Sequence, residues 1–186
     1  MDPTSPVADP PFVAMSRSFD IRSEMRYTCV DGMLIENEFG SRLNALDRDF
    51  FARADTLLRN FGYVPKRSKT KDVIFVFARK GRNVAKFALD SHGTARMYLK
   101  YYATPDPDAY FQNRIRIVME EFAFRYAGMI PGAIEGVGYR HRGPDGREYF
   151  LFHSEMIDVG VPGVAELTEI ERLVARQTAW WDDGNP

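Results

Sequence analysis

Three segments of the chain place apolar residues at the three- and four-residue spacing of a helix that buries one face. The predicted helices span 47–62, 106–128 and 164–182. Asp47 can cap the start of the first helix, and Gly62 can end it in a left-handed conformation. Asp106 before Pro107 is a strong start signal for the second helix, because proline already has the backbone angle of a first helical residue.

The stretch between the first two helices has the two-residue alternation of β-strands. Its apolar runs are rich in β-branched and aromatic side chains, and short turns at 80–82 and 91–93 interrupt them. We predict three antiparallel strands at 72–79, 83–89 and 94–102. Because Phe87 and Leu89 alternate with Lys86, one face of this meander is expected to be buried and the other solvated.

The segment YRHRGPDGREYFLFHSEM, residues 139–156, predicts a β-hairpin. Its strands are expected at 137–142 and 147–153, around a turn at 143–146. The Pro-Asp-Gly sequence suits a tight turn, since proline fixes its own backbone angle and glycine tolerates a positive one. A loop of this length places Arg142 opposite Glu148 and His141 opposite Tyr149.

Together these elements predict an α+β domain. We expect an antiparallel sheet of about five strands, made of the three-stranded meander and the hairpin, with three helices packed mainly on one face. This single domain is predicted at 16–182, between a disordered, proline-rich N-terminal tail at 1–15 and a C-terminal tail at 183–186. The candidate starts of translation are Met1, Met15, Met25 and Met33.

The composition indicates where in the cell the protein is found, and it excludes a disulfide and a cysteine-rich zinc site. The 186 residues are 45% hydrophobic, with a formal net charge of -1 and one cysteine, Cys29. A single cysteine forms neither an intramolecular disulfide nor a cysteine-rich zinc site. No apolar run approaches the roughly 20 residues of a membrane span, and the N-terminus lacks the basic and apolar regions of a secretory signal. We therefore expect a cytoplasmic protein without a membrane partner.

Two histidines of the hairpin are candidate metal ligands. His141 and His153 would need a further ligand such as Glu155 or Glu135. No metal-binding spacing of the HExxH type is present, so ordinary strand histidines are the simpler interpretation. The glycine-rich link at 128–138 lacks the dinucleotide and P-loop patterns, and no nucleophile elbow occurs. The sequence therefore predicts no catalytic residue and no cofactor.

The segment between 66 and 86 is strongly basic. Its positively charged residues are Lys66, Arg67, Lys69, Lys71, Arg79, Lys80, Arg82 and Lys86. Asp72 is the one acidic residue within this segment, and phenylalanines lie between the charges. Basic residues interleaved with aromatic ones are typical of surfaces that bind single-stranded nucleic acid. A sheet edge guarded by lysines against aggregation is the alternative interpretation.

The lack of a catalytic motif favours a small-molecule-binding or regulatory module that does not catalyse a reaction. Aromatic residues make up 13% of the chain, and ligand pockets are rich in them. We expect a pocket between the sheet and the second or last helix, lined by Tyr101, Tyr139, Tyr149 and Trp180. A nucleic-acid-binding protein is the second hypothesis, and a degenerate metalloprotein or enzyme that uses the hairpin histidines is the third.

Three phrases, in this order, carry a family resemblance: ALDRDFFARADTLLRNFGYVPKRSKTKD, MEEFAFRYAG and YRHRGPDGREYFLFHSEMIDV. They resemble a family of small, uncharacterised bacterial proteins common in Firmicutes, and the likeness covers residues 40–180. The resemblance implies the same layout of elements. It also implies a cysteine-rich link and a further cysteine in the second hairpin strand of those relatives, which suggests a metal or redox site there. This chain has no cysteine between Gly128 and Gly138 and offers Phe152 and His153 in the strand, so it cannot repeat that site with the same ligands.

Overall fold

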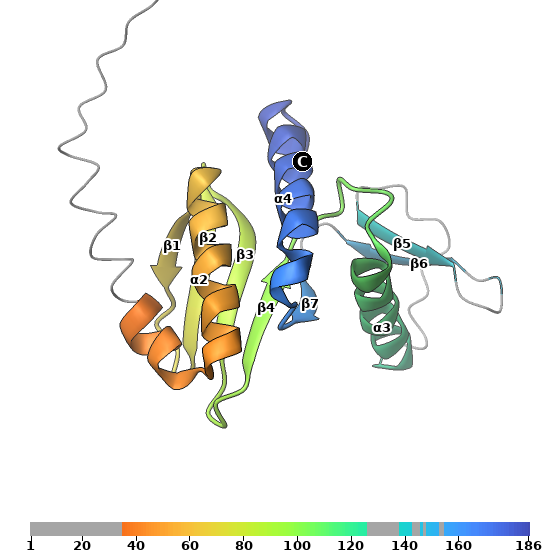
Figure 1. Ribbon diagram of the computed structural model, residues 1–186. Coiled ribbons are helices and arrows are strands. Elements are labelled where there is room, and N and C mark those ends of the chain that lie inside the picture. Colours follow the sequence, from red (N-terminus) through yellow and green to blue (C-terminus); the bar gives the residue numbers. More distant parts are fainter. Residues whose placement is uncertain (1–34, 126–137, 143–145, 147, 153–154) are drawn as a thin grey trace, which may run out of the picture.

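The computed structural model describes residues 35–125, 138–142, 146, 148–152 and 155–186 (Figure 1). Its helices are α2 (Ala45–Asn60), α3 (Ala109–Arg125) and α4 (Leu167–Asp182), with short helical turns η1 (Ile35–Phe39), η2 (Gly40–Arg42) and η3 (Val164–Glu166). Its strands are β1 (Val64–Arg67), β2 (Val73–Arg79), β3 (Arg82–Leu89), β4 (Ala95–Leu99), β5 (Gly138–Arg142), β6 (Glu148–Phe152) and β7 (Ile157–Gly160). No helix in these ranges has the length and hydropathy that crossing a membrane requires. The predicted tail at 1–15 lies outside the described residues.

The strands form a five-stranded antiparallel sheet in the order β1-β2-β3-β4-β7 and a separate two-stranded sheet, β5-β6. The α+β class, the five-stranded sheet and the β2-β3-β4 meander are confirmed. The prediction that the hairpin joins the meander was wrong, because β1 and β7 complete the large sheet instead. Each of these two strands is only four residues long, too short to show an alternation of its own in the sequence.

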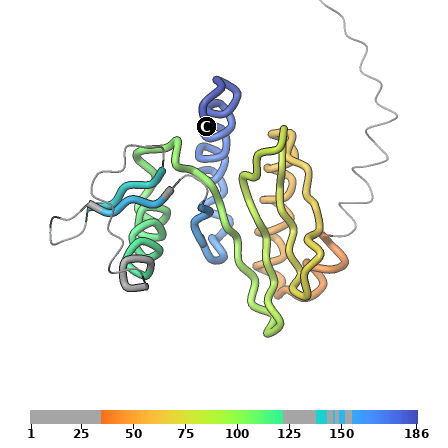
Figure 2. Tube along the Cα trace, turned by 180° about the vertical axis from the view of Figure 1, so that it is seen from behind, coloured from red at the N-terminus to blue at the C-terminus, as the bar shows by residue number. Residues whose placement is uncertain are grey.

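Two helices cover one face of the large sheet. In Figure 1, α2 and α4 lie in front of the strands, and Figure 2 shows the strands from behind with no described helix across them. The third helix, α3, and the hairpin lie beside the sheet at its β7 edge. The side chains that face α2 and α4 alternate along the strands and are buried: Val73, Phe75, Phe77, Ala85, Phe87, Leu89, Ala95, Met97 and Leu99. We call the opposite side, which carries Lys66, Val76, Lys86, Tyr98 and Asp158, the open face.

Phenylalanines join the helical layer to the sheet. The ring of Phe51 on α2 lies edge-on to Phe87 on β3, with centroids 4.9 Å apart, and to Phe39 at 4.8 Å. Phe77 on the neighbouring strand lies 4.6 Å from Phe87. Edge-to-face contacts of this kind add to the free energy gained by burying the rings, so this cluster fixes how α2 sits on the sheet.

The helix caps correct two predictions made from the sequence. Asn44, not Asp47, caps α2: its Oδ1 accepts a hydrogen bond from the Asp47 amide at 2.9 Å. Asp108, not Asp106, precedes α3 and accepts from the Phe111 amide at 3.1 Å. Arginines of α4 bind the Asp106 side chain instead.

Glycines end two helices as the turn chemistry requires. Gly62 has φ +81°, which confirms the predicted left-handed end of α2, and the following Tyr63 amide donates to the Leu58 carbonyl at 3.1 Å. Gly184 ends α4 with φ +84°. The segment predicted as a C-terminal tail, 183–186, makes hydrogen bonds with the body of the protein, since the Tyr102 hydroxyl donates to the Pro186 carbonyl at 2.9 Å.

We predict that Asn44→Ala lowers the free energy of unfolding by about 1 kcal/mol, because it leaves the Asp47 amide at the start of α2 without an acceptor. Asn44→Ser is the matched control, since serine keeps a side-chain acceptor and should retain most of the stability. Urea unfolding of the three proteins measures the difference. Equal midpoints for the alanine and serine variants would contradict the assigned cap.

Candidate functional site

A cavity of about 330 Å³ lies where the open face meets α3 and the hairpin. Its lining residues are Tyr98, Val118, Glu121, Leu151, Glu155, Met156 and Asp158. They come from β4, α3, β6, β7 and the segment before β7, so three separate parts of the fold meet here. We call this space the β7-edge cavity.

Strand register places the floor of the cavity. One row of directly paired residues crosses all five strands on the open face: Lys66, Val76, Lys86, Tyr98 and Asp158. Tyr98 therefore lies between a cation and an anion. The Lys86 ammonium is 3.7 Å from the centroid of the Tyr98 ring, within the range of a cation–π contact.

Asp158 is a structural carboxylate whose charge is already matched. Its Oδ2 accepts from Arg96 Nη1 at 2.7 Å, and its Oδ1 accepts from the Gly160 amide at 2.8 Å and from Arg114 Nη2 at 3.3 Å. Arg114 also donates through Nε to the Asp158 carbonyl at 2.8 Å. This carboxylate therefore ties β4, β7 and α3 together rather than serving as a free base.

Two lysines next to Tyr98, Lys86 and Lys100, have ammonium groups that no carboxylate of the described residues pairs with. Burial lowers the pKa of Lys86, and the nearby Asp158 offsets this in part. Burial likewise lowers the pKa of Lys100, against a smaller opposite effect of Glu155. Within the described residues, neither lysine forms an ion pair. A ligand with a negative charge would therefore stabilise both ammonium groups.

Tyr98 keeps its proton. Burial raises the pKa of its phenol, and the charge of Asp158 raises it further. At neutral pH the side chain therefore offers a flat apolar ring and a hydroxyl that can donate a hydrogen bond.

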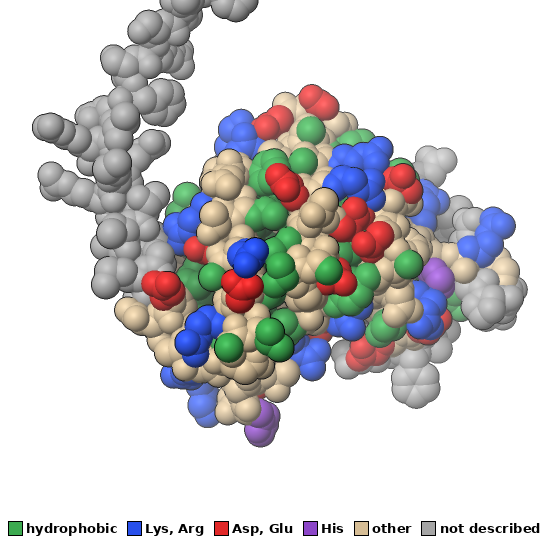
Figure 3. All heavy atoms as spheres, viewed as in Figure 1, with side chains coloured by type: hydrophobic (Ala, Val, Ile, Leu, Met, Phe, Trp, Pro, Cys, Tyr) green, Lys and Arg blue, Asp and Glu red, His purple; other side chains and the backbone are tan. Residues whose placement is uncertain are grey.

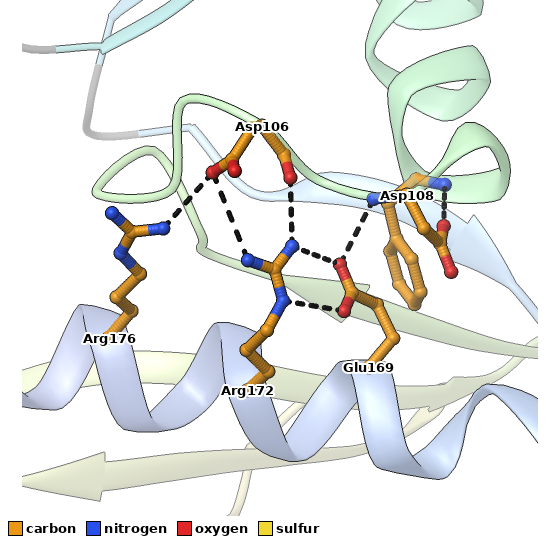
Figure 4. Close-up of polar contacts among 6 residues, drawn as sticks. Asp106, Asp108, Glu169, Arg172 and Arg176 are labelled. Atoms are coloured by element: carbon orange, nitrogen blue, oxygen red, sulfur yellow. Dashed lines mark hydrogen bonds and ion pairs between the residues drawn. The ribbon is translucent and has the colours of Figure 1, made fainter.

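The α3 wall of the cavity is positioned by α4 (Figure 4). Arg172 donates to the Asp106 carbonyl at 2.8 Å, and Arg176 donates to the Asp106 side chain at 3.0 Å. Glu169 accepts from the Asp108 amide at 3.0 Å, and its hydrogen bonds with Arg172 lower the pKa of its carboxyl. These contacts hold the loop that leads into α3.

The four aromatic residues predicted to bind a ligand lie in different surroundings. Tyr101 and Tyr139 are 0% and 3% exposed, and their rings are 5.3 Å apart. Tyr139 accepts from the Tyr101 amide at 2.9 Å, while the Tyr101 hydroxyl donates to the Phe111 carbonyl at 3.0 Å. Tyr149 stacks on a histidine and Trp180 packs against the core from α4. None of the four lines the β7-edge cavity, so their role in binding stays a prediction.

The candidate metal ligands are only partly described. His141 pairs with Tyr149 as predicted, with ring centroids 6.3 Å apart, and its Nε2 is buried without a hydrogen-bond partner. Glu155 lines the cavity, and His153 lies outside the described residues. Among the residues that are described, no three histidine, cysteine or acidic side chains come together to hold a metal ion. The predicted metal set of three therefore stays untested.

The eight basic residues of segment 66–86 lie on different elements of the fold. Several of its members have partners: Arg67 pairs with Glu38 at 2.9 Å, and both Arg79 and Lys80 pair with Asp182 at 3.0 Å. The remaining members are Lys69 and Lys71 between β1 and β2, Lys66 and Lys86 on the open face, and Arg82, which lies over the Trp181 ring at 5.7 Å. On the helix-covered face, positive and negative side chains are interspersed (Figure 3). Three of the eight residues are therefore already paired within the protein, and nucleic-acid binding stays a prediction.

A second groove, of about 380 Å³, lies between α2 and α4. Its lining residues are Ala52, Arg53, Thr56, Leu57, Asn60, Phe61 and Glu171. Arg53 is already paired with Asp49 at 3.0 Å. This groove brings together fewer charged groups than the β7-edge cavity, which we therefore take as the candidate site.

No family model, curated protein or solved structure matches this chain. The function therefore has to be argued from the residues of the β7-edge cavity.

We predict that Asp158→Asn lowers the free energy of unfolding by about 1 to 2 kcal/mol, because the amide presents an N–H group to a guanidinium of Arg96 or Arg114. The control is Asp49→Asn, which removes an exposed pair within α2 and should change stability by less than about 0.5 kcal/mol. Denaturant unfolding measures both. Equal losses in the two variants would show that Asp158 is only a surface charge.

The lowered pKa of Lys86 predicts a pH dependence. In the window between its folded value and 10.5, the unfolded chain binds the additional proton, so the contribution of Lys86 to stability rises with pH. Lys86→Met removes this contribution. We therefore expect the free energy of unfolding of the wild type, relative to that of the methionine variant, to rise as the pH increases toward 10.5. A constant difference would contradict the burial of the ammonium group.

Proposed function

We propose that this protein is a small-molecule-binding module that holds its ligand in the β7-edge cavity and does not catalyse a reaction on it. The observation that carries the proposal is the convergence of three parts of the fold on one space of about 330 Å³. Pockets for small ligands commonly have volumes from about 300 Å³ upwards, mostly apolar walls and a few placed polar groups. Tyr98, Val118, Leu151 and Met156 supply the apolar walls here.

The character of the lining supports binding rather than catalysis. Among the residues that the structure describes, none that lines the cavity is a serine, cysteine or histidine. The carboxylate of Asp158 is bound by two guanidinium groups, so both of its oxygens already have partners within the protein. The remaining groups are suited to recognising charge on a ligand.

Binding at this position would also couple parts of the fold. A ligand that contacts Tyr98, Val118 and Leu151 bridges the sheet, α3 and the hairpin. Because the ligand binds the folded chain and not the unfolded one, it raises stability in proportion to the logarithm of its concentration above Kd. A regulatory role would use this coupling, in which ligand binding fixes the hairpin against the sheet.

The test is an NMR screen of one-ring fragments against protein labelled at methyl groups. We expect binders to shift the methyl signals of Val118, Leu151 and Met156, which line the cavity. Val118→Trp should abolish these shifts by filling the space. Thr56→Trp, which fills the α2–α4 groove instead, is the matched control and should leave them unchanged. Shifts confined to Leu57 in that groove, or no binder at all, would refute the proposal.

A further inference from the structure

We infer that the ligand of the β7-edge cavity is a small zwitterion: an ammonium and a carboxylate carried on an apolar body, of which an apolar amino acid is the simplest example. This inference rests on the proposed binding function and adds the chemical class of the ligand. It follows from which charges around the cavity are already matched within the protein and which are not.

The apolar body is required by the walls. Val118 from α3, Leu151 from β6 and Met156 before β7 stand around the Tyr98 ring. Contact with these side chains removes apolar surface of the ligand from water, which gives binding most of its favourable free energy.

A negative group is favoured at the Lys86 side. The Lys86 ammonium is half-buried and rests on the ring of Tyr98, which lines the cavity. Lys100 lies two residues after Tyr98 in the chain. The two lysines are neighbours of the cavity through Tyr98 and are not among its described lining residues. Neither has a carboxylate within ion-pair distance in the part of the chain that the structure describes. A carboxylate of the ligand would restore the interactions that these ammonium groups lose on burial.

A positive group is favoured at the Glu155 side. Glu155 is exposed, lines the cavity and forms no ion pair with the described residues. The other two lining carboxylates differ from it: Asp158 is matched by two arginines, and Glu121 has an interaction of its own. Glu155 is therefore the acceptor that we assign to a ligand ammonium.

A ligand that carries only one charge is repelled by a protein group of the same sign. An amine without a carboxylate brings a second cation toward Lys86 and Lys100, and an acid without an ammonium brings a second anion toward Glu155. The two protein charges lie close enough for Glu155 to act electrostatically on Lys100. A zwitterion satisfies both groups, and each single-charge analogue is disfavoured by repulsion as well as by the missing contact.

The experiment compares three probes with the same apolar body. L-phenylalanine carries both charges, phenethylamine carries only the ammonium, and 3-phenylpropionate carries only the carboxylate. We expect L-phenylalanine to bind at least about tenfold more tightly than either analogue, measured by titration of the Val118, Leu151 and Met156 methyl signals. Equal or tighter binding of one analogue would overturn the zwitterion class while leaving the binding function intact. Failure of all three to shift these signals would overturn the zwitterion class, and the fragment screen decides separately whether the cavity binds any other ligand.

Single substitutions assign each charge to its partner. In Lys86→Met, L-phenylalanine should lose about tenfold in affinity while phenethylamine loses none, and Lys86→Arg should restore the preference. In the Glu155→Gln variant, the affinity for L-phenylalanine should fall to the affinity that this variant has for 3-phenylpropionate. Glu171→Gln in the α2–α4 groove is the matched control and should change nothing. Unchanged affinities in both Lys86→Met and Glu155→Gln, with their NMR spectra still those of folded protein, would overturn the assignment.

Discussion

The pairing of β4 with β7 is the constraint on which the rest of the structure depends. It joins Tyr98 to Asp158 and Leu99 to Ile157, so the chain leaves the sheet after β4 and must return to the same edge. The connection between these two strands is long and includes α3 and the hairpin, and its two ends are fixed side by side by the pairing. A connection of this kind has to pack beside the edge of the sheet at which it starts. The β7-edge cavity is the space left where the connection meets the sheet.

The same pairing leaves β7 as an edge strand, and α3 takes the place of a further strand. Tyr110 donates to the Val159 carbonyl at 2.6 Å, and Arg114 donates to the Asp158 carbonyl at 2.8 Å. Side chains thus satisfy backbone acceptors that would otherwise be open to pairing with another chain. At the other edge, β1 carries Pro65, which has no amide hydrogen to offer, and the charged Lys66.

The sequence predicted what depends on neighbours along the chain. The alternation of apolar and polar residues predicted the meander, and the Pro-Asp-Gly turn predicted the pairing of His141 with Tyr149. Gly62 predicted the end of α2. The caps were misjudged because several acidic or amide residues compete within three positions, and tertiary contacts decide among them. Asp106 is the plain case, since Arg176 binds its side chain and leaves the cap to Asp108.

The candidate site was less predictable, because it depends on pairs of residues far apart in sequence. Lys86 was singled out, but as one member of a basic segment rather than as the neighbour of Tyr98. Glu155 was singled out as a metal ligand. Tyr98 and Asp158 were missed, because their meeting requires the register of β7, a strand of four residues without a recognisable pattern.

The hydrogen bond between Tyr139 and the Tyr101 amide has a further consequence for motion. If the hairpin lifted away from the sheet, this buried N–H would lose its acceptor, and the edge-to-face contact of the two rings would be lost with it. Partial separation is therefore costly, and the small sheet, α3 and the end of β4 should open together as one cooperative unit rather than fray piece by piece. Exchange of the Tyr101 amide hydrogen with solvent would report on that opening.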